Sequence, residues 1–211
     1  MRKLFIPVIA FASIAMVSCG GAETKEEEKK GEAVVVDDKD PMEINLTGLR
    51  EFDMSPYDLN IVIYVPEKYR ENENQEQVFL QPDIEHHDGE AEWTITMKGE
   101  KNFNLVLVDW GEMPQSVVDE KAKHADNSNI YTYIYNEEGE NFMLFSRVLN
   151  TENTTLDQED MKDLPSHHFY AVKEIEGNYI IGKSNSMKDF YQVSARKMMN
   201  CVRAMKASPK V

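Results

Sequence analysis

Most of the chain beyond Pro41 alternates apolar and polar side chains, the pattern typical of β-strands. Residues 92–98 alternate strictly and are followed by a Gly-Glu turn and an apolar run over residues 103–110, so the sequence predicts a hairpin there. The stretch 59–65 is rich in β-branched residues and ends at Pro66, which predicts a well-buried strand. The chain is therefore expected to build mainly a sheet.

Two further pairs of apolar segments flank short turns that contain glycine. Residues 130–135 are paired in this way with residues 142–149, and residues 169–175 with residues 179–182. Strands joined by short turns run antiparallel. The sequence thus predicts an antiparallel sheet of about six or seven strands.

Two segments carry helical signals. Pro114 and the acidic residues after it predict a short crossover helix over about residues 114–123. Ser186, with Asp189 three residues later, resembles a capping box and predicts a last helix from Ser186 to about Lys206. Side chains at steps of three and four form one stripe on it: Met187, Phe190, Tyr191, Ser194, Met198, Cys201, Val202 and Met205. We expect this C-terminal helix to pack on one face of the sheet, although a partner-binding helix would show the same stripe.

The predicted elements describe one α+β domain over residues 41–211, an antiparallel sheet with a short crossover helix and a C-terminal helix. The order of strands, crossover helix, paired hairpins and final helix, over roughly residues 44–206, resembles that of PsbP-like domains. This resemblance implies a non-catalytic, accessory role on the envelope side of the cell. It transfers no site residues.

Residues 1–18 have the organisation of a signal peptide. A cationic start is followed by an apolar run that is too short to span a bilayer, which takes about 20 residues. The segment Met16-Val17-Ser18-Cys19 resembles the lipobox of signal-peptidase-II substrates. The resemblance implies attachment of a diacylglyceryl group to Cys19, cleavage before it and acylation of the new amino terminus. An ordinary secretory signal that contains a cysteine is the alternative.

Residues 19–40 are acidic and low in complexity, and they cannot bury enough apolar area to offset the entropy of ordering them. We interpret them as a lipidated acidic tether. Gly20 is not the Asp that marks inner-membrane retention, and the acidic cluster near Lys25 resembles surface-export signals of Bacteroidota lipoproteins. We therefore expect a lipid anchor in the outer membrane, with the domain on the periplasmic or the surface side.

Composition narrows the class of partner. The 211 residues are 41% hydrophobic and 29% charged, with a mean hydropathy of -0.54, as in soluble globular domains. The formal net charge is -15, and the chain has no stripe of Lys and Arg that could neutralise phosphates, so we expect no nucleic-acid partner. The expected partners are the membrane, through the lipid anchor, and an envelope protein.

Two adjacent histidine pairs are the candidate ligands for a metal ion: His86 with His87, and His167 with His168. Two imidazoles with a carboxylate can hold zinc or copper if they converge. Neighbouring residues of a strand point to opposite sides, so each pair would donate one ligand. No spacing typical of zinc sites is present, and polar histidines at loop edges are the alternative interpretation.

Three tyrosines, Tyr131, Tyr133 and Tyr135, share one face of their predicted strand. Such a row suits the binding of a peptide, a glycan or a partner protein. It also suits the half-wet side of a sheet, where the rings pack and the hydroxyl groups reach water. If the C-terminal helix covers the other face, the tyrosine row is the exposed one.

Motifs for catalysis are missing from the sequence. It has no Gly-x-Ser-x-Gly and no glycine-rich phosphate loop. With Cys19 lipidated, Cys201 is the remaining thiol, and its place on the helical stripe predicts a buried, inert side chain. The first hypothesis is therefore a non-enzymatic binding or accessory domain without a cofactor. Metal or small-ligand binding by the paired histidines is the second, and a hydrolase without a known motif is the third.

Overall fold

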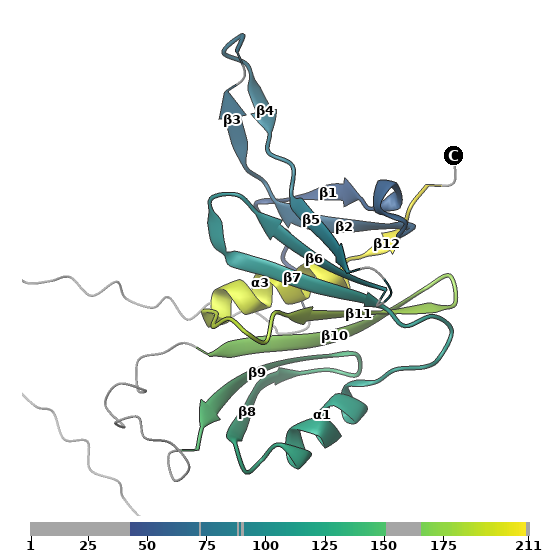
Figure 1. Ribbon diagram of the computed structural model, residues 1–211, viewed down its shortest axis with the longest axis vertical. Helices are drawn as coiled ribbons and strands as arrows, with labels where there is room; N and C mark the ends of the chain where they lie inside the picture. Colours follow the sequence, from purple (N-terminus) through teal and green to yellow (C-terminus); the bar gives the residue numbers. More distant parts are fainter. Residues whose placement is uncertain (1–42, 72, 88, 90, 151–165, 210–211) are drawn as a thin grey trace, which may run out of the picture. The chain divides into compact units, whose positions relative to one another are not determined.

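The chain builds a seven-stranded antiparallel sheet in the order β5-β6-β7-β11-β10-β9-β8, drawn in the computed structural model of Figure 1. Its strands are β5 (Asp83–His87), β6 (Glu92–Met97), β7 (Glu100–Asp109), β8 (Tyr131–Glu138), β9 (Phe142–Leu149), β10 (His167–Ile175) and β11 (Asn178–Ser184). The structure describes residues 43–209, apart from 72, 88, 90 and 151–165. The predictions for residues 1–18, for Cys19 and for the tether 19–40 therefore lie outside the described residues.

The three predicted hairpins are confirmed as antiparallel neighbours. Ile95 pairs with Leu105 between β6 and β7, Tyr133 with Arg147 between β8 and β9, and Val172 with Ile181 between β10 and β11. Successive side chains of a strand point to opposite faces, so Phe142 and Leu144 of β9 join the main core, and Met143 and Phe145 join a second cluster on the other face. The predicted α+β class with a mainly antiparallel sheet is therefore right.

Two smaller sheets were not predicted. The buried strand expected at residues 59–65 forms as β2 (Ile61–Pro66), but it pairs with β1 (Leu49–Asp53) and β12 (Lys206–Ala207) in a separate three-stranded sheet. A 3-10 turn, η1 (Ser55–Tyr57), joins β1 to β2. The short strands β3 (Tyr69–Glu71) and β4 (Gln77–Phe79) form a hairpin that stands out from the larger sheets in Figure 1. Their pairing depends on contacts across the chain that periodicity does not show.

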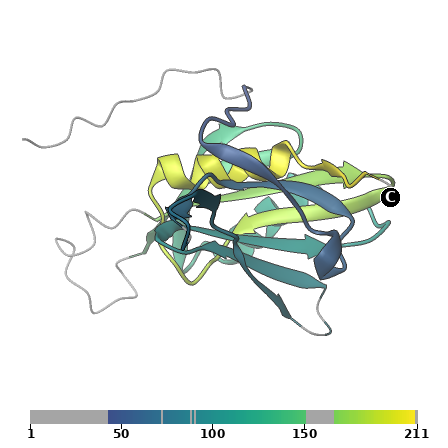
Figure 2. The same ribbon diagram turned by 90° about the horizontal axis from the view of Figure 1, so that it is seen from above.

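The C-terminal helix α3 (Gln192–Arg203) packs on one face of the large sheet, as expected. It contacts β10 and β11, and it also contacts β2 of the three-stranded sheet, beside which it lies in Figure 2. Its inner side chains belong to the main core: Ala195, Met198, Met199, Cys201 and Val202. A Cβ atom at Gly182 of β11 would overlap the side chain of Val202, so a glycine is needed where α3 approaches the strand.

The start of α3 was predicted wrongly. The helix begins at Gln192, not at Ser186, and Met187 of the expected stripe is 91% exposed. Asn185 Oδ1 accepts a hydrogen bond from the Met187 backbone N–H at 2.9 Å, a local bond that competes with helix formation. The Phe190 carbonyl in turn accepts a bond from the His167 backbone N–H at 3.0 Å, which holds the segment before the helix against the start of β10.

The crossover helix α1 (Val117–Asp126) lies on the other face of the large sheet (Figure 1). It starts about three residues later than predicted, because Ser116 is the N-cap and its Oγ accepts a bond from the Asp119 backbone at 3.4 Å. Beneath it lies a second apolar cluster: Val117, Met143, Phe145, Tyr170, Val172 and Ile181. Both faces of the sheet therefore carry a helix.

Candidate functional site

The histidines lie in strands and a helix: two in β5, one in α1 and two in β10, with His87 the last residue of β5 and His167 the first of β10. His86 stacks on Trp93 of the main core, with ring centroids 4.6 Å apart and an interplanar angle of 5°. Its neighbour His87 points to the other face, where Nε2 lies 3.1 Å from Thr94 Oγ1. The two members of the pair are thus on opposite sides of the sheet, as the strand geometry requires.

The second pair divides in the same way. His167 Nδ1 lies 2.9 Å from Ser146 Oγ, and His168 Nδ1 lies 2.9 Å from Ser184 Oγ, where the ring is buried. His168 belongs to the face that carries α1, because it pairs with Phe145 of the cluster under that helix. Among the described residues, no three His, Cys, Asp or Glu side chains are close enough to hold a metal ion. The histidine metal site therefore stays a prediction.

A cavity of about 220 Å³ opens between α1 and the sheet. Its lining includes the aromatic residues Tyr133, Phe145 and Tyr170, together with His124 of α1 and His168 of β10. Aromatic rings with a few polar groups are typical of small-ligand sites. This cavity is therefore the first part of the candidate site.

His124 is one of the α1 side chains that line this cavity, together with Glu120 and Lys123. Its ring stacks on Tyr133, and its Nδ1 lies 3.1 Å from the Tyr135 hydroxyl. Burial lowers the pKa of His124, although the nearby Glu120 carboxylate partly opposes that shift. Burial thus favours the neutral imidazole, which serves as a ring contact and a hydrogen-bonding group.

His168 is more strongly perturbed. Burial, aided by the positive charge of Arg147, lowers the pKa of His168 to about 3. The ring is therefore neutral at physiological pH and acts in the cavity as a hydrogen-bonding group, without a charge. A general base works best when its pKa is near the operating pH, so His168 is poorly suited to that role.

Arg147 of β9 is a positively charged residue in the lining of the cavity. Its Nε donates to Ser166 Oγ at 3.2 Å, an Nη donates to the Ser186 carbonyl at 2.6 Å, and the guanidinium lies 5.1 Å from the Tyr131 ring centroid. No carboxylate lies within ion-pair distance of it in the part of the chain that the structure describes. The guanidinium is thus fixed in place, with charge left for an anion.

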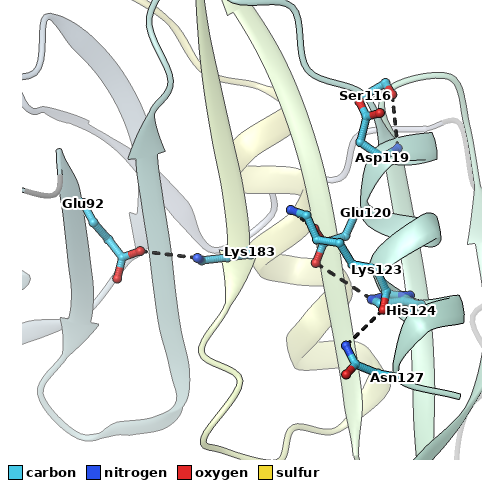
Figure 3. Close-up of polar contacts among 8 residues, drawn as sticks. All are labelled: Glu92, Ser116, Asp119, Glu120, Lys123, His124, Asn127 and Lys183. Atoms are coloured by element: carbon cyan, nitrogen blue, oxygen red, sulfur yellow. Dashed lines mark hydrogen bonds and ion pairs between the residues drawn. The ribbon is translucent and has the colours of Figure 1, made fainter. Parts of the chain in front are cut away.

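A larger cavity of about 520 Å³ adjoins the first one, and both are lined by Lys183 and Ser186. Its floor is polar, with Thr94 and Thr96 of β6 and Asn104 of β7. The Lys183 ammonium pairs with Glu92 at 3.3 Å. Figure 3 shows this pair beside the α1 residues Glu120 and His124. We refer to these two adjoining cavities together as the α1-side groove.

The tyrosine row is not the open face that the sequence suggested. Tyr133 and Tyr135 are half-buried because α1 covers them. The Lys121 ammonium of α1 lies 4.7 Å from the centroid of the Tyr135 ring. The residues that sequence reasoning missed are Arg147, Lys183 and Asn104. The signal for Arg147 was the hairpin register, since Arg147 lies directly opposite Tyr133 and so shares its face.

The Cys201 thiol was predicted to be buried and inert. Cys201 is fully buried, and burial raises the pKa of its thiol to about 12, which fits the inert role expected of it.

Over the described ranges, no helix has both the length and the hydropathy that crossing a membrane requires. The chain matches no family model and no curated protein.

Proposed function

We propose that this chain is an envelope lipoprotein, anchored by acyl chains on Cys19, whose domain is non-catalytic and binds another envelope component through the α1-side groove. The observation that carries the proposal is the pair of adjoining cavities on one face of the sheet. The element order that resembles PsbP-like domains supports the same accessory role. The outer membrane, with the domain on its periplasmic or surface side, is the proposed location.

The groove suits binding better than chemistry. Its two central imidazoles, His124 and His168, are held neutral by burial, and each is engaged with a neighbouring hydroxyl, of Tyr135 or Ser184. Rings held in this way orient a ligand without exchanging protons readily at neutral pH. The surrounding aromatic and polar side chains add area and direction to such an interaction.

The lipid anchor is tested by metabolic labelling with a palmitate analogue in cells that express the full chain. The wild type and a Cys201→Ala variant are expected to incorporate label, and Cys19→Ala is expected to lose it. Cys201 is the matched control because it is the second cysteine of the chain. Equal labelling of Cys19→Ala would contradict the proposed anchor.

Binding is tested with a photo-crosslinking amino acid placed at Thr94, on the floor of the groove, in cells that make the acylated protein. The control position is Val118 on α1, which is 68% exposed and outside both cavities. We expect a reproducible crosslinked component from Thr94 and none from Val118. Identical products from the two positions, or none from either, would count against binding through the groove.

The alternative function is binding of a small ligand with the help of the paired histidines. It is favoured by one specific observation, that one histidine of each pair, His87 and His168, lies in the lining of the groove. Thermal unfolding in the presence of zinc or copper tests the metal form of this alternative, since a bound ion raises the melting temperature with its concentration. No shift with either ion, or the same shift in a His87→Ala, His168→Ala double variant, would remove it.

A further inference from the structure

The smaller cavity of the α1-side groove has one uncompensated charge among the described residues. Its lining holds three cations, Arg147, Lys123 and Lys183, and one carboxylate, Glu120. Lys123 pairs with Glu120 at 2.9 Å, and Lys183 pairs with Glu92 of the larger cavity at 3.3 Å. Arg147 has no carboxylate within ion-pair distance in the same part of the chain. The charge that this cavity can offer to a ligand is therefore the guanidinium of Arg147.

The Arg147 guanidinium is held in place by neutral groups. Its Nε and one Nη atom donate to the Ser166 hydroxyl and the Ser186 carbonyl, and its flat side lies 5.1 Å from the Tyr131 ring centroid. The other Nη atom donates to no group in the described residues and is not buried. A guanidinium has five N–H groups, so this one is oriented and still has donors for an oxygen anion. A carboxylate is the planar anion that matches it.

Aromatic rings are the nearest neighbours of Arg147 on this face of the sheet. Tyr133 of β8 lies directly opposite Arg147, and Phe145 precedes Arg147 by two positions on the same side of β9. His168 of β10 in turn lies opposite Phe145. All of them line the smaller cavity, and the three strands are adjacent, with about 5 Å from one to the next. A ligand of one ring and one carboxylate can therefore reach both the rings and the guanidinium.

The size and polarity of the cavity also favour such a ligand. Its volume of about 220 Å³ is below the range of about 300–1,000 Å³ that is usual for drug-sized ligands. The rings of its lining carry no negative charge that would repel a carboxylate, because burial keeps His168 neutral and raises the pKa of the Tyr170 hydroxyl. The occupant is thus expected to be small, flat and negatively charged.

We infer that the smaller cavity of the α1-side groove binds a small aromatic monocarboxylate, with its carboxylate on Arg147 and its ring against Tyr133, Phe145 and His168. Offset or edge contacts between aromatic rings contribute beyond the area that they bury, and a guanidinium can hold both carboxylate oxygens at once. The inference rests on the proposed function, because it names the ligand class for one of the two cavities of that groove.

The test is a titration of the full-length acylated protein in detergent, followed by saturation-transfer NMR of the ligand, with protein-free micelles measured in parallel. The probes are benzoate, benzamide and acetate. Benzamide keeps the ring and the shape of benzoate without the charge, and acetate keeps the carboxylate without the ring. We expect benzoate to bind about tenfold more tightly than either of the others, since each of them lacks one set of contacts. Equal affinity for benzoate and one of the other probes, or no benzoate signal beyond that of the micelles, overturns the inference.

Variants of Arg147 test the position of the carboxylate. Arg147→Gln is expected to weaken benzoate binding about tenfold and to leave benzamide binding unchanged, because only benzoate loses an ion pair. Arg147→Lys keeps the charge without the planar fork and should weaken benzoate less. Lys101→Gln, which removes an exposed cation outside both cavities, is the matched control for charge. Unchanged benzoate affinity in Arg147→Gln overturns the assignment. If that variant does not fold, the comparison of benzoate with benzamide in the wild type decides the question.

The two proposals fail separately. A crosslinked component recovered from Thr94 together with no benzoate binding would retain the accessory function and remove the aromatic carboxylate. Benzoate binding with no crosslinked component would retain the ligand and remove the envelope partner.

Discussion

His124 of α1 lies face to face with Tyr133 of β8, with ring centroids 4.0 Å apart and an interplanar angle of 7°. Only Val117 and His124 are buried among the residues of this helix, and they lie at its two ends. The stack is therefore the main contact that holds the C-terminal half of α1 over the sheet. It also forms one wall of the α1-side groove, so the position of the helix and the shape of the groove depend on the same ring.

Replacing His124 with alanine should loosen α1. We expect His124→Ala to lower the free energy of unfolding by ~1–3 kcal/mol, from the lost aromatic contact and the Tyr135 hydroxyl left without its partner. Urea denaturation measures the change, and amide hydrogen exchange of residues 117–126 should become faster. Val118→Ala on the exposed side of the same helix should change stability by less than ~0.5 kcal/mol. An equal effect of the two substitutions would contradict the role of the stack.

Short-range pairing was readable from the sequence. The hairpins β6–β7, β8–β9 and β10–β11 join neighbours in the chain through short turns, and the two-residue period sets which side chains face the core. The stripe of Met198, Cys201 and Val202 likewise located the buried side of α3. In each case the pattern lies within a few residues, so local chemistry determines it.

Long-range pairing was not readable. Lys206 and Val62 are partners in the three-stranded sheet, and no local pattern relates positions so far apart. The groove was missed for the same reason, because it depends on which face of the sheet α1 covers. The three tyrosines were correctly predicted to share one face of the sheet. The sequence alone did not show which of the two helices packs on that face, and in the structure it is α1.

His168 should make stability depend on pH. Its folded pKa of about 3 lies below the ordinary value of 6.5, so between these values the unfolded chain binds a proton that the folded chain does not. The free energy of unfolding is therefore independent of His168 above about pH 6.5. As the pH falls below that value, it decreases by up to ~1.4 kcal/mol per pH unit. We expect urea denaturation at pH 7 and pH 5 to show a smaller loss for His168→Asn, which keeps a partner for Ser184. A parallel loss in both proteins would contradict this assignment.

Glu137 should contribute more than its neighbour Glu138. Glu137 is buried at the end of β8 and accepts two hydrogen bonds from Arg196 of α3, one of them from Nε at 2.6 Å. Glu137→Gln removes the charge that Arg196 binds, and because the Arg196 side chain is 32% exposed we expect a cost of ~1–3 kcal/mol in chemical denaturation. Glu138→Gln is the control, because its pair with Lys121 at 2.5 Å is on the surface and such pairs contribute ~0–1 kcal/mol. Equal costs would show that the Glu137 pair is not effectively buried.

The Cys201 thiol should be inaccessible in the folded protein. In a Cys19→Ala variant it is the one thiol left in the chain, it is fully buried, and its Sγ donates to the Lys197 carbonyl at 3.2 Å. Because the thiolate is the reactive form, we expect negligible reaction with a thiol reagent such as dithionitrobenzoate at pH 8 under native conditions. Stoichiometric reaction should follow in guanidinium chloride. Rapid labelling of the native protein would show that α3 opens readily from the sheet.

Gly182 and Val202 should be coupled in stability, because the side chain of one occupies the space that a Cβ atom on the other would need. Gly182→Ala forces β11 and α3 apart or displaces Val202, and should lower the free energy of unfolding by about 2–3 kcal/mol. Val202→Ala alone leaves a cavity in the core and should cost ~1–3 kcal/mol.

The double variant discriminates a local clash from a general loss of strand propensity. If the methyl group introduced by Gly182→Ala fills the space vacated at Val202, Gly182→Ala with Val202→Ala should be more stable than the sum of the single costs by ~1 kcal/mol or more. Denaturant unfolding of the four proteins measures this coupling. Additive costs would mean that Gly182 is not required for the approach of α3, and that the helix is held at this distance from the sheet by the other side chains of the core.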